Sequence, residues 1–70
     1  MNWSVAKDHW KNFKGTVKAR WDKLTDDELE TVAGEREDLV GCIQERYGMS
    51  RDAAEWQLME FERKLSRVHY

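Results

Sequence analysis

Apolar side chains recur at intervals of three and four residues along most of this chain, and that spacing restricts its fold more than any other feature. At 3.6 residues per turn, residues spaced in this way form one stripe along a helix. The 70 residues include no proline and only four glycines, a composition that favours helices over a turn-rich sheet protein. We therefore expect a single all-α domain over residues 1–70, a small four-helix domain of short amphipathic helices.

Residues typical of helix ends separate the expected helices. Thr25 and Glu28 have the spacing of a capping box, and Ser50 is suited to cap the last helix. Gly34 and Gly48 are each placed to end a helix in the left-handed conformation. The helices are expected at about Ser4 to Lys23, between Thr25 and Gly34, at about Glu35 to Tyr47, and from Ser50 to about Val68.

Each expected helix carries one apolar stripe that we expect to face the core. A domain of this length buries only about 60% of the surface that its unfolded chain exposes, so it has few apolar residues to spare. Gly15 lies within the first helix, where we expect it to be tolerated at a cost of about 1 kcal/mol relative to alanine. The predicted inward residues are Trp10, Phe13, Val17, Trp21 and Leu24, then Leu29, Val32 and Ala33, then Leu39, Val40, Ile43 and Tyr47, and finally Ala54, Leu58, Phe61, Leu65 and Val68.

Three segments of the sequence are similar to those of a known family. They are "WKNFKGTVKARWDKLTDDELE", "GEREDLVGCIQERYG" and an "AE" a few residues further on. Over nearly the whole chain these segments resemble the bacterial CsbD-like proteins, small stress-response proteins of the YjbJ type. The resemblance implies a cytoplasmic bundle of two roughly orthogonal helical hairpins that is induced by general stress, and it implies no reaction, ligand or catalytic residue. Cys42 and Trp56 depart from the family pattern, since a polar residue is expected at both positions, or a basic one at the first.

Charge is unevenly distributed along the chain. Residues 1–24 carry a net charge of +4, whereas residues 25–70 carry −6. Four lysines of the first expected helix lie within a band about 60° wide, and we call this band the lysine ridge. Its members are Lys7, Lys11, Lys14 and Lys18.

The lysine ridge has two interpretations. It could follow the phosphates of a nucleic acid as a weak, sequence-independent anion-binding surface. However, the aromatic residues among these lysines belong to the core stripe and are not free to stack on bases. We therefore favour the second interpretation, in which the ridge is a solvated helix edge whose lysines pair with acids of the other helices.

Patterns typical of catalysis or metal binding are not evident. His9 and His69 lie near opposite ends of the chain, and Cys42 has no partner at the spacing of metal ligands. We expect no enzyme activity, metal or cofactor. A single cysteine cannot form an internal disulfide, which suits a reducing compartment. Cys42 lies at the margin of its helix's core face, where a half-buried structural thiol is favoured over a redox switch.

Two large apolar residues lie on the side of the last expected helix that should face water. Trp56 and Met59 are about 170° and 130° from the core stripe of that helix. Scattered exposed apolar residues are ordinary in soluble proteins. The alternative is a second packed face, covered by an earlier helix or by a partner chain. Trp3 likewise either folds back as an N-terminal anchor or stays loose.

The preferred interpretation is a non-enzymatic stress-associated protein that acts by binding or by abundance. Weak nucleic-acid binding through the lysine ridge is the alternative. No run of ten uninterrupted apolar residues occurs, and the start "MNWSVAKDHW" lacks the apolar stretch of a signal peptide. We therefore expect a cytoplasmic protein without membrane association that is either monomeric or weakly self-associating. An unknown protein partner is compatible with these features.

Overall fold

The structure is a computed structural model that describes residues 2–68, and it describes side chains as far as Leu65. The described residues form helices and no strand, which confirms the expected all-α class. Residues 2–68 form five helices where the sequence predicts four. They are α1 (Trp3–Asp8), α2 (Trp10–Arg20), α3 (Asp26–Val32), α4 (Arg36–Tyr47) and α5 (Arg51–Val68).

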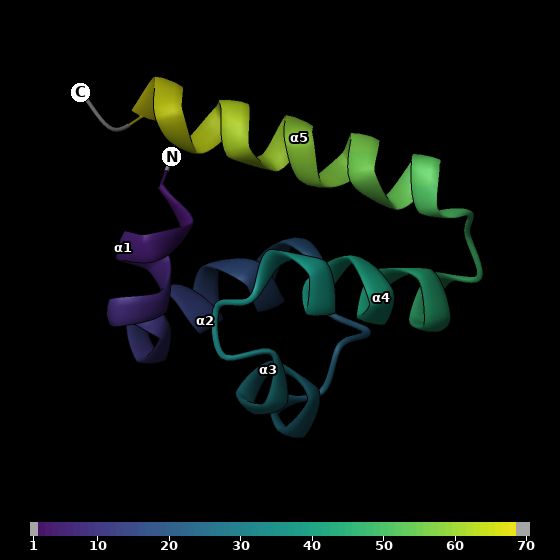
Figure 1. Cartoon of the computed structure of the whole chain (residues 1–70), viewed down its shortest axis with the longest axis horizontal. Helices are drawn as coiled ribbons and strands as arrows, with labels where there is room; N and C mark the ends of the chain where they lie inside the picture. The colour runs from purple at the N-terminus through teal and green to yellow at the C-terminus, as the bar shows by residue number, and fades with distance from the viewer. Residues whose placement is uncertain (1, 69–70) are drawn as a thin grey trace.

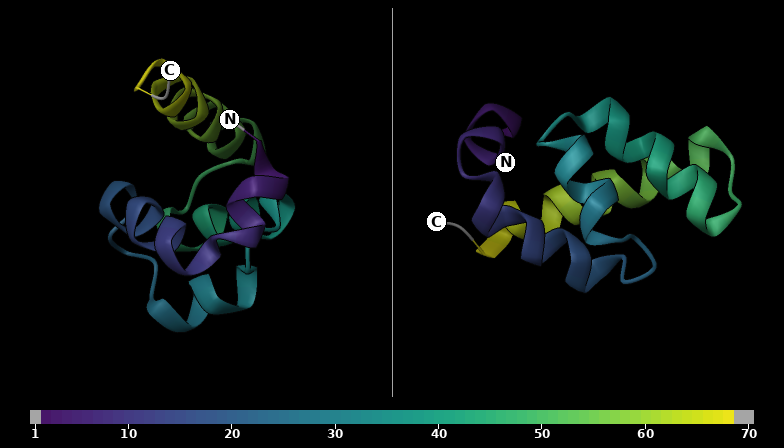
Figure 2. Two further views of the ribbon diagram at one scale, coloured as in Figure 1. Left: turned by 90° about the vertical axis from the view of Figure 1, so that its left-hand side faces the viewer. Right: turned by 90° about the horizontal axis from the view of Figure 1, so that it is seen from below.

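Helix α5 forms one edge of the molecule, and the other four helices lie on one side of it (Figure 1). It runs beside α4 in the opposite direction, after a short connection (Figure 1). The end-on view shows α5 above the remaining helices, so that its outer side meets no other part of the described chain (Figure 2). The expected arrangement of two orthogonal hairpins stays a prediction.

The single helix predicted from Ser4 to Lys23 is wrong, because the chain leaves the helical conformation at His9 (φ −116°, ψ 32°) and again at Trp21 (φ −126°, ψ 79°). In one continuous helix, Trp3 and Phe13 would lie about 15 Å apart along the axis. The break at His9 instead brings their ring centroids to 5.9 Å in an edge-to-face contact. Trp3 therefore folds back against the core, the first of its two expected outcomes.

The predicted caps are present. The hydroxyl of Thr25 accepts a hydrogen bond from the amide of Glu28 at 3.2 Å, and the Glu28 carboxylate accepts one from the amide of Thr25 at 2.9 Å. Ser50 accepts from the amide of Ala53 at 3.2 Å at the start of α5. Gly48 ends α4 with a left-handed φ of 60°. These contacts satisfy amides and carbonyls that a helix end leaves without an intrahelical partner.

The end of α3 differs from the prediction at one residue. Ala33, expected to point inward, is exposed and takes the left-handed conformation with φ 48°. Gly34 is also left-handed, with φ 86°, and it is the residue that is buried. Two successive left-handed residues turn the chain sharply, which carries the alanine methyl group away from the core.

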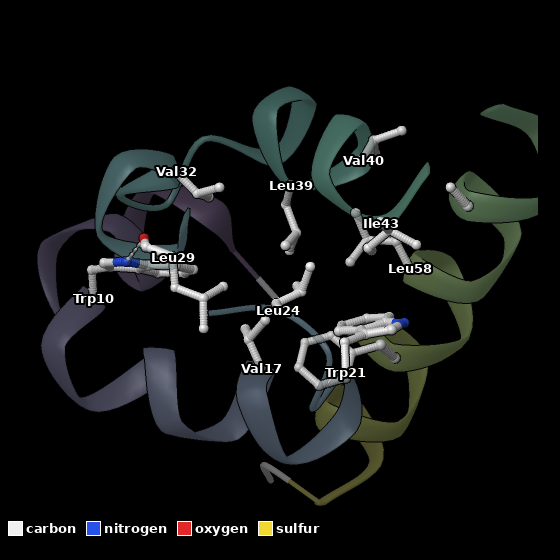
Figure 3. Packing of buried hydrophobic residues seen from close by; sticks show 12 residues of the cluster. Trp10, Val17, Trp21, Leu24, Leu29, Val32, Leu39, Val40, Ile43 and Leu58 are labelled. Atoms are coloured by element: carbon white, nitrogen blue, oxygen red, sulfur yellow. Dashed lines mark hydrogen bonds between the residues drawn. The ribbon is translucent and has the colours of Figure 1, made fainter. Parts of the chain in front are cut away.

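The remaining inward predictions are confirmed for the described side chains, with Val68 outside that range. Residues of α2, α3, α4 and α5 converge on one core, together with Leu24 from the connection after α2 (Figure 3). The indole of Trp10 donates a hydrogen bond to the Leu29 carbonyl at 2.7 Å within it. Phe13, Tyr47 and Leu65 are partly buried against its rim. The core is thus complete without any residue from the outer side of α5.

We expect Thr25→Ala to lower the free energy of unfolding by about 0.5 to 2 kcal/mol, because it removes the acceptor of the capping box. The effect should be local, so amide hydrogen exchange should accelerate within α3. Thr16→Ala is the matched control, since Thr16 is exposed within α2 and is not a cap. Unchanged exchange in α3 would show that the cap does not stabilise this helix.

We expect Gly15→Ala to raise the free energy of unfolding by about 0.5 to 1 kcal/mol. Gly15 is exposed within α2, and a methyl group at this position would meet no heavy atom within 4 Å. The substitution therefore restricts the unfolded chain without a steric cost in the folded one. Urea unfolding measures the change, and a loss of stability would reveal a contact that the fold does not show.

Candidate interaction surfaces

The lysine ridge crosses the break at His9, with Lys7 on α1 and the other three lysines on α2. Lys11 is exposed and forms no ion pair with the side chains that the structure describes. The other three ammonium groups pair with acids of α3 and of the residue before α4, as the solvated-edge interpretation expects. These pairs are Lys7–Glu35, Lys14–Glu30 and Lys18–Asp26, the last at 3.2 Å.

These ion pairs change the electrostatic character of the ridge. The hydrogen bond to Glu35 raises the pKa of Lys7, and the hydrogen bond to Glu30 raises that of Lys14, so both lysines stay charged. Each carboxylate also cancels part of the positive field that a phosphate would meet. An incoming polyanion would therefore have to displace or coexist with three acids, which leaves a ridge of low net charge.

A shallow depression of about 260 Å³ lies between α1 and the start of α4. Its charged side chains are already paired with acids or bases of the described chain, which leaves none of them uncommitted for chemistry on a substrate. The residues around it are Trp3, Ser4, Lys7, Gly34, Glu35, Arg36 and Glu37.

Arg36 at the start of α4 binds one flank of α5, beside its core stripe, and it was not among the residues predicted from the sequence. Its guanidinium donates to Glu55 at 2.7 Å and to Glu62 at 3.1 Å. Trp3 also donates to the Glu62 carboxylate, so one cluster joins α1, α4 and α5. The hydrogen bond from Arg36 lowers the pKa of Glu55. The available sequence signal is that Glu55 and Glu62 are seven residues apart and share a helix face, but nothing in the sequence indicates Arg36 as their partner.

The side of α5 opposite its core stripe carries the two residues that the sequence singles out. Trp56 is 63% exposed and Met59 is 51% exposed. With their neighbours they lie within an arc of about 120° at 100° per residue, which we call the outer face of α5. The outer face consists of Asp52, Ala53, Trp56, Met59, Glu60 and Arg63.

The other candidate residues are not brought together. His9 is exposed at the break between α1 and α2. Cys42 is partly buried against the core, and burial raises the pKa of its thiol, which fits the predicted structural role. His69 lies outside the described residues.

Among those described, no group of three or more His, Cys, Asp and Glu side chains is arranged to hold a metal ion. No described helix has the length and apolar character needed to span a bilayer.

Comparisons with known proteins agree with the motifs. The CsbD-like family model matches residues 5–55. The UPF0337 protein YjbJ of Escherichia coli strain K12 is 50% identical over 62 residues, which cover 89% of this chain and 90% of that protein. The UPF0337 protein ECA0631 of Pectobacterium atrosepticum has the same identity over 62 residues and the same coverage of both chains.

A more distant relative also covers most of the chain. The UPF0337 protein NE2439 of Nitrosomonas europaea is 46% identical over 61 residues, which cover 87% of this chain and 65% of that protein. Trp56 and Met59 lie just beyond the range that the family model matches. The match over more than half of the chain, together with relatives at about half identity, shows that this protein belongs to the CsbD-like family.

Proposed function

We propose that this chain is a non-enzymatic bacterial general stress-response protein of the cytoplasm, and that it acts by binding through the outer face of α5. The observation that carries the proposal is the exposure of Trp56 and Met59 side by side on a helix whose opposite side already completes the core. The names of the relatives assign them no reaction. Binding therefore accounts for a feature of the described residues that the core does not require.

The energetics favour a contact surface at this position. Burial of a large apolar side chain contributes about 1.5 to 3 kcal/mol. Two such side chains that are exposed in the free protein would therefore stabilise a complex that covers them. Tryptophan is also the residue type most enriched among interface positions that dominate binding energy. Met59 is flexible and can adapt its shape to a partner beside the rigid indole. A tryptophan next to a methionine on an otherwise polar face is thus well suited to anchor another protein chain.

Capture under stress tests this proposal. Tagged wild-type chain and the variant Trp56→Gln/Met59→Gln would be cross-linked in stressed bacteria, and the captured chains identified by mass spectrometry. Val5→Gln is the matched control, because Val5 is another exposed apolar residue, 55% exposed, that lies on α1. We expect wild type and Val5→Gln to capture the same chains and the double variant to lose them. Equal capture by all three proteins would contradict the proposal.

Weak, sequence-independent nucleic-acid binding by the lysine ridge is the second candidate function. It is favoured by the position of four ammonium groups along α1 and α2, with Lys11 outside the ion pairs described above. It is opposed by the three acids that already pair with the ridge and by the net charge of −6 on residues 25–70. These charges act within a Debye length of about 10 Å at 0.1 M salt. We therefore rank it below binding by α5.

A fourfold substitution separates the two candidates. We expect the wild-type protein to show no retention on mixed-sequence DNA at about 50 mM salt, and Lys7, Lys11, Lys14 and Lys18→Gln to alter only its net charge. The reason is that the paired acids cancel the attraction of the ridge for phosphates. Salt-sensitive micromolar binding by the wild type that disappears in the fourfold variant would instead support nucleic-acid binding, with a salt slope of about 0.9 for each phosphate neutralised.

A further inference from the structure

We propose that the outer face of α5 binds the outer face of a second copy of this chain, with the two α5 helices antiparallel. The inference rests on the proposed function, because it names the occupant of the same surface. It is carried by a symmetry in the positions of four exposed residues. They are Asp52, Trp56, Met59 and Arg63.

An interface with a twofold axis is self-complementary, so that residue i of one chain contacts residue j of the other and the reverse also holds. The midpoint between Trp56 and Met59 lies between positions 57 and 58, and so does the midpoint between Asp52 and Arg63. One axis at right angles to α5 through this point therefore brings Trp56 to the height of Met59 of the second copy. The same axis places Asp52 opposite Arg63 of the second copy.

The residues also lie on matching sides of the helix. At 100° per residue, Arg63, Asp52 and Met59 are about 20°, 40° and 60° to one side of Trp56. When two helices pack antiparallel about such an axis, residues on the same side of each face meet. The Asp52–Arg63 contact thus satisfies the rotation about the helix as well as the position along it, because these residues are only about 20° apart. Trp56 and Met59 are about 60° apart, so they lie at the same height and beside one another across the interface.

The charges support this pairing. Asp52 forms no ion pair with the side chains that the structure describes. Among the described side chains, Arg63 pairs with Glu60 in the neighbouring turn at 3.0 Å and with no other acid, and its own side chain is 75% exposed. A pair of this kind contributes only about 0.2 to 0.5 kcal/mol, so it does not prevent Arg63 from reaching another acid. Both charged groups remain available to a second copy.

The surroundings fit an interface of small size. The two opposite-charge pairs would lie about 8 Å on either side of the axis, which gives an apolar centre with a polar rim. No other described helix lies on this side of α5, so a second chain meets no obstacle there (Figures 1 and 2). An interface made by one face of one helix is at the small end of specific interfaces, and a weak dimer is expected.

Charge reversal tests the pairing. The mass of the purified full chain would be measured by sedimentation equilibrium from about 10 μM to 1 mM, the range of weak dissociation constants. We expect the average mass of the wild-type protein in solution to rise with concentration, from the 8.4 kDa of one chain towards twice that mass. Asp52→Arg and Arg63→Asp should each raise the dissociation constant about tenfold or more, because either change places like charges together twice in the dimer.

The decisive sample is an equimolar mixture of the Asp52→Arg and Arg63→Asp chains. In the mixed dimer every charge of the pair again faces an opposite charge, so two variants that do not associate alone should associate with each other. Glu45→Arg is the control, since it changes the charge by the same amount at an exposed position on α4. It should leave the wild-type association unchanged. Circular dichroism of each variant establishes that it is folded.

A wild-type chain that stays at 8.4 kDa over the whole range would overturn the inference, and so would a mixture no heavier than either variant alone. The proposed function fails separately. If the wild type is monomeric but Trp56→Gln/Met59→Gln still loses the chains captured in cells, only the identity of the occupant is wrong. If capture does not depend on these two residues, the proposed function itself is wrong.

Discussion

Replacement of Phe61 by alanine is expected to lower the free energy of unfolding by about 3 to 5 kcal/mol. Phe61 is buried, and its ring centroid lies 4.9 Å from that of Trp21 and 6.1 Å from that of Phe13. Removal of the ring leaves a cavity beside these two rings, because Phe13 is held by α2 and the indole of Trp21 is held by its hydrogen bond to Gln57. A small domain has only a few kcal/mol of net stability, so most of it would be lost.

Urea unfolding followed by circular dichroism measures this loss. Met59→Ala is the matched control, because Met59 lies two residues away on the same helix but faces outward. It should change stability by no more than about 0.5 kcal/mol. A Phe61→Ala protein that loses no more stability than Met59→Ala would show that the assignment of the inner and outer sides of α5 is wrong.

Replacement of Gly34 by alanine is expected to lower the free energy of unfolding by about 2 to 5 kcal/mol, through two separate costs. Gly34 has φ 86°, a conformation that strains any residue with a Cβ atom. In addition, a Cβ at this position would lie 2.6 Å from the Cα of Lys7. Backbone cannot move aside as a flexible side chain can, so α1 would have to shift away from the turn between α3 and α4.

Gly48→Ala separates the two costs. Gly48 is also left-handed, with φ 60°, but a Cβ there would meet no heavy atom within 4 Å. It should therefore lose only the conformational part, about 1 to 2 kcal/mol. Thermal unfolding of both variants gives the difference, which reports the contact with α1. Equal losses would mean that α1 does not pack on Gly34 in solution.

The parts of the fold that depend on local chemistry could be predicted from the sequence. The capping box of Thr25 and Glu28 and the end of α4 at Gly48 are set by neighbouring residues, and both were predicted correctly. The core stripes follow from helical periodicity, which needs no knowledge of the partner helix. The exposure of Trp56 and Met59 follows from the same periodicity, since both lie far from the inward stripe of α5.

The parts that depend on contacts between distant residues could not be predicted. The break at His9 has no proline or glycine to mark it, and it is held by the packing of Trp3 on Phe13. The close approach of Gly34 to Lys7 likewise joins segments that are far apart in the sequence. Helical periodicity predicts Ala33 to face inward, because it continues past the residue where the left-handed turn begins.

The lysine ridge and the outer face of α5 also differ in how much of each could be predicted from the sequence. Angular positions on a helix predict that the four lysines of the ridge share a side, but they do not show which acids lie opposite. The ion pairs with Glu30 and Asp26 depend on how α3 packs beside α2. The charge that a ligand would meet at the lysine ridge is therefore a property of the tertiary structure, whereas the apolar character of the outer face of α5 is already present in one helix.

The most direct test of binding by the outer face of α5 is the nuclear magnetic resonance spectrum of the indole N–H groups. Trp3, Trp10 and Trp21 each donate a hydrogen bond inside the protein, whereas Trp56 is exposed. The spectrum of the ¹⁵N-labelled chain would be recorded at about 10 μM, where a weak dimer is mostly dissociated, first in buffer and then with excess unlabelled chain and lysate of stressed bacteria. We expect the Trp56 signal to shift or broaden while the three internal signals stay in place. An unchanged Trp56 signal, with changes confined to the amides of the lysine ridge, would contradict the account.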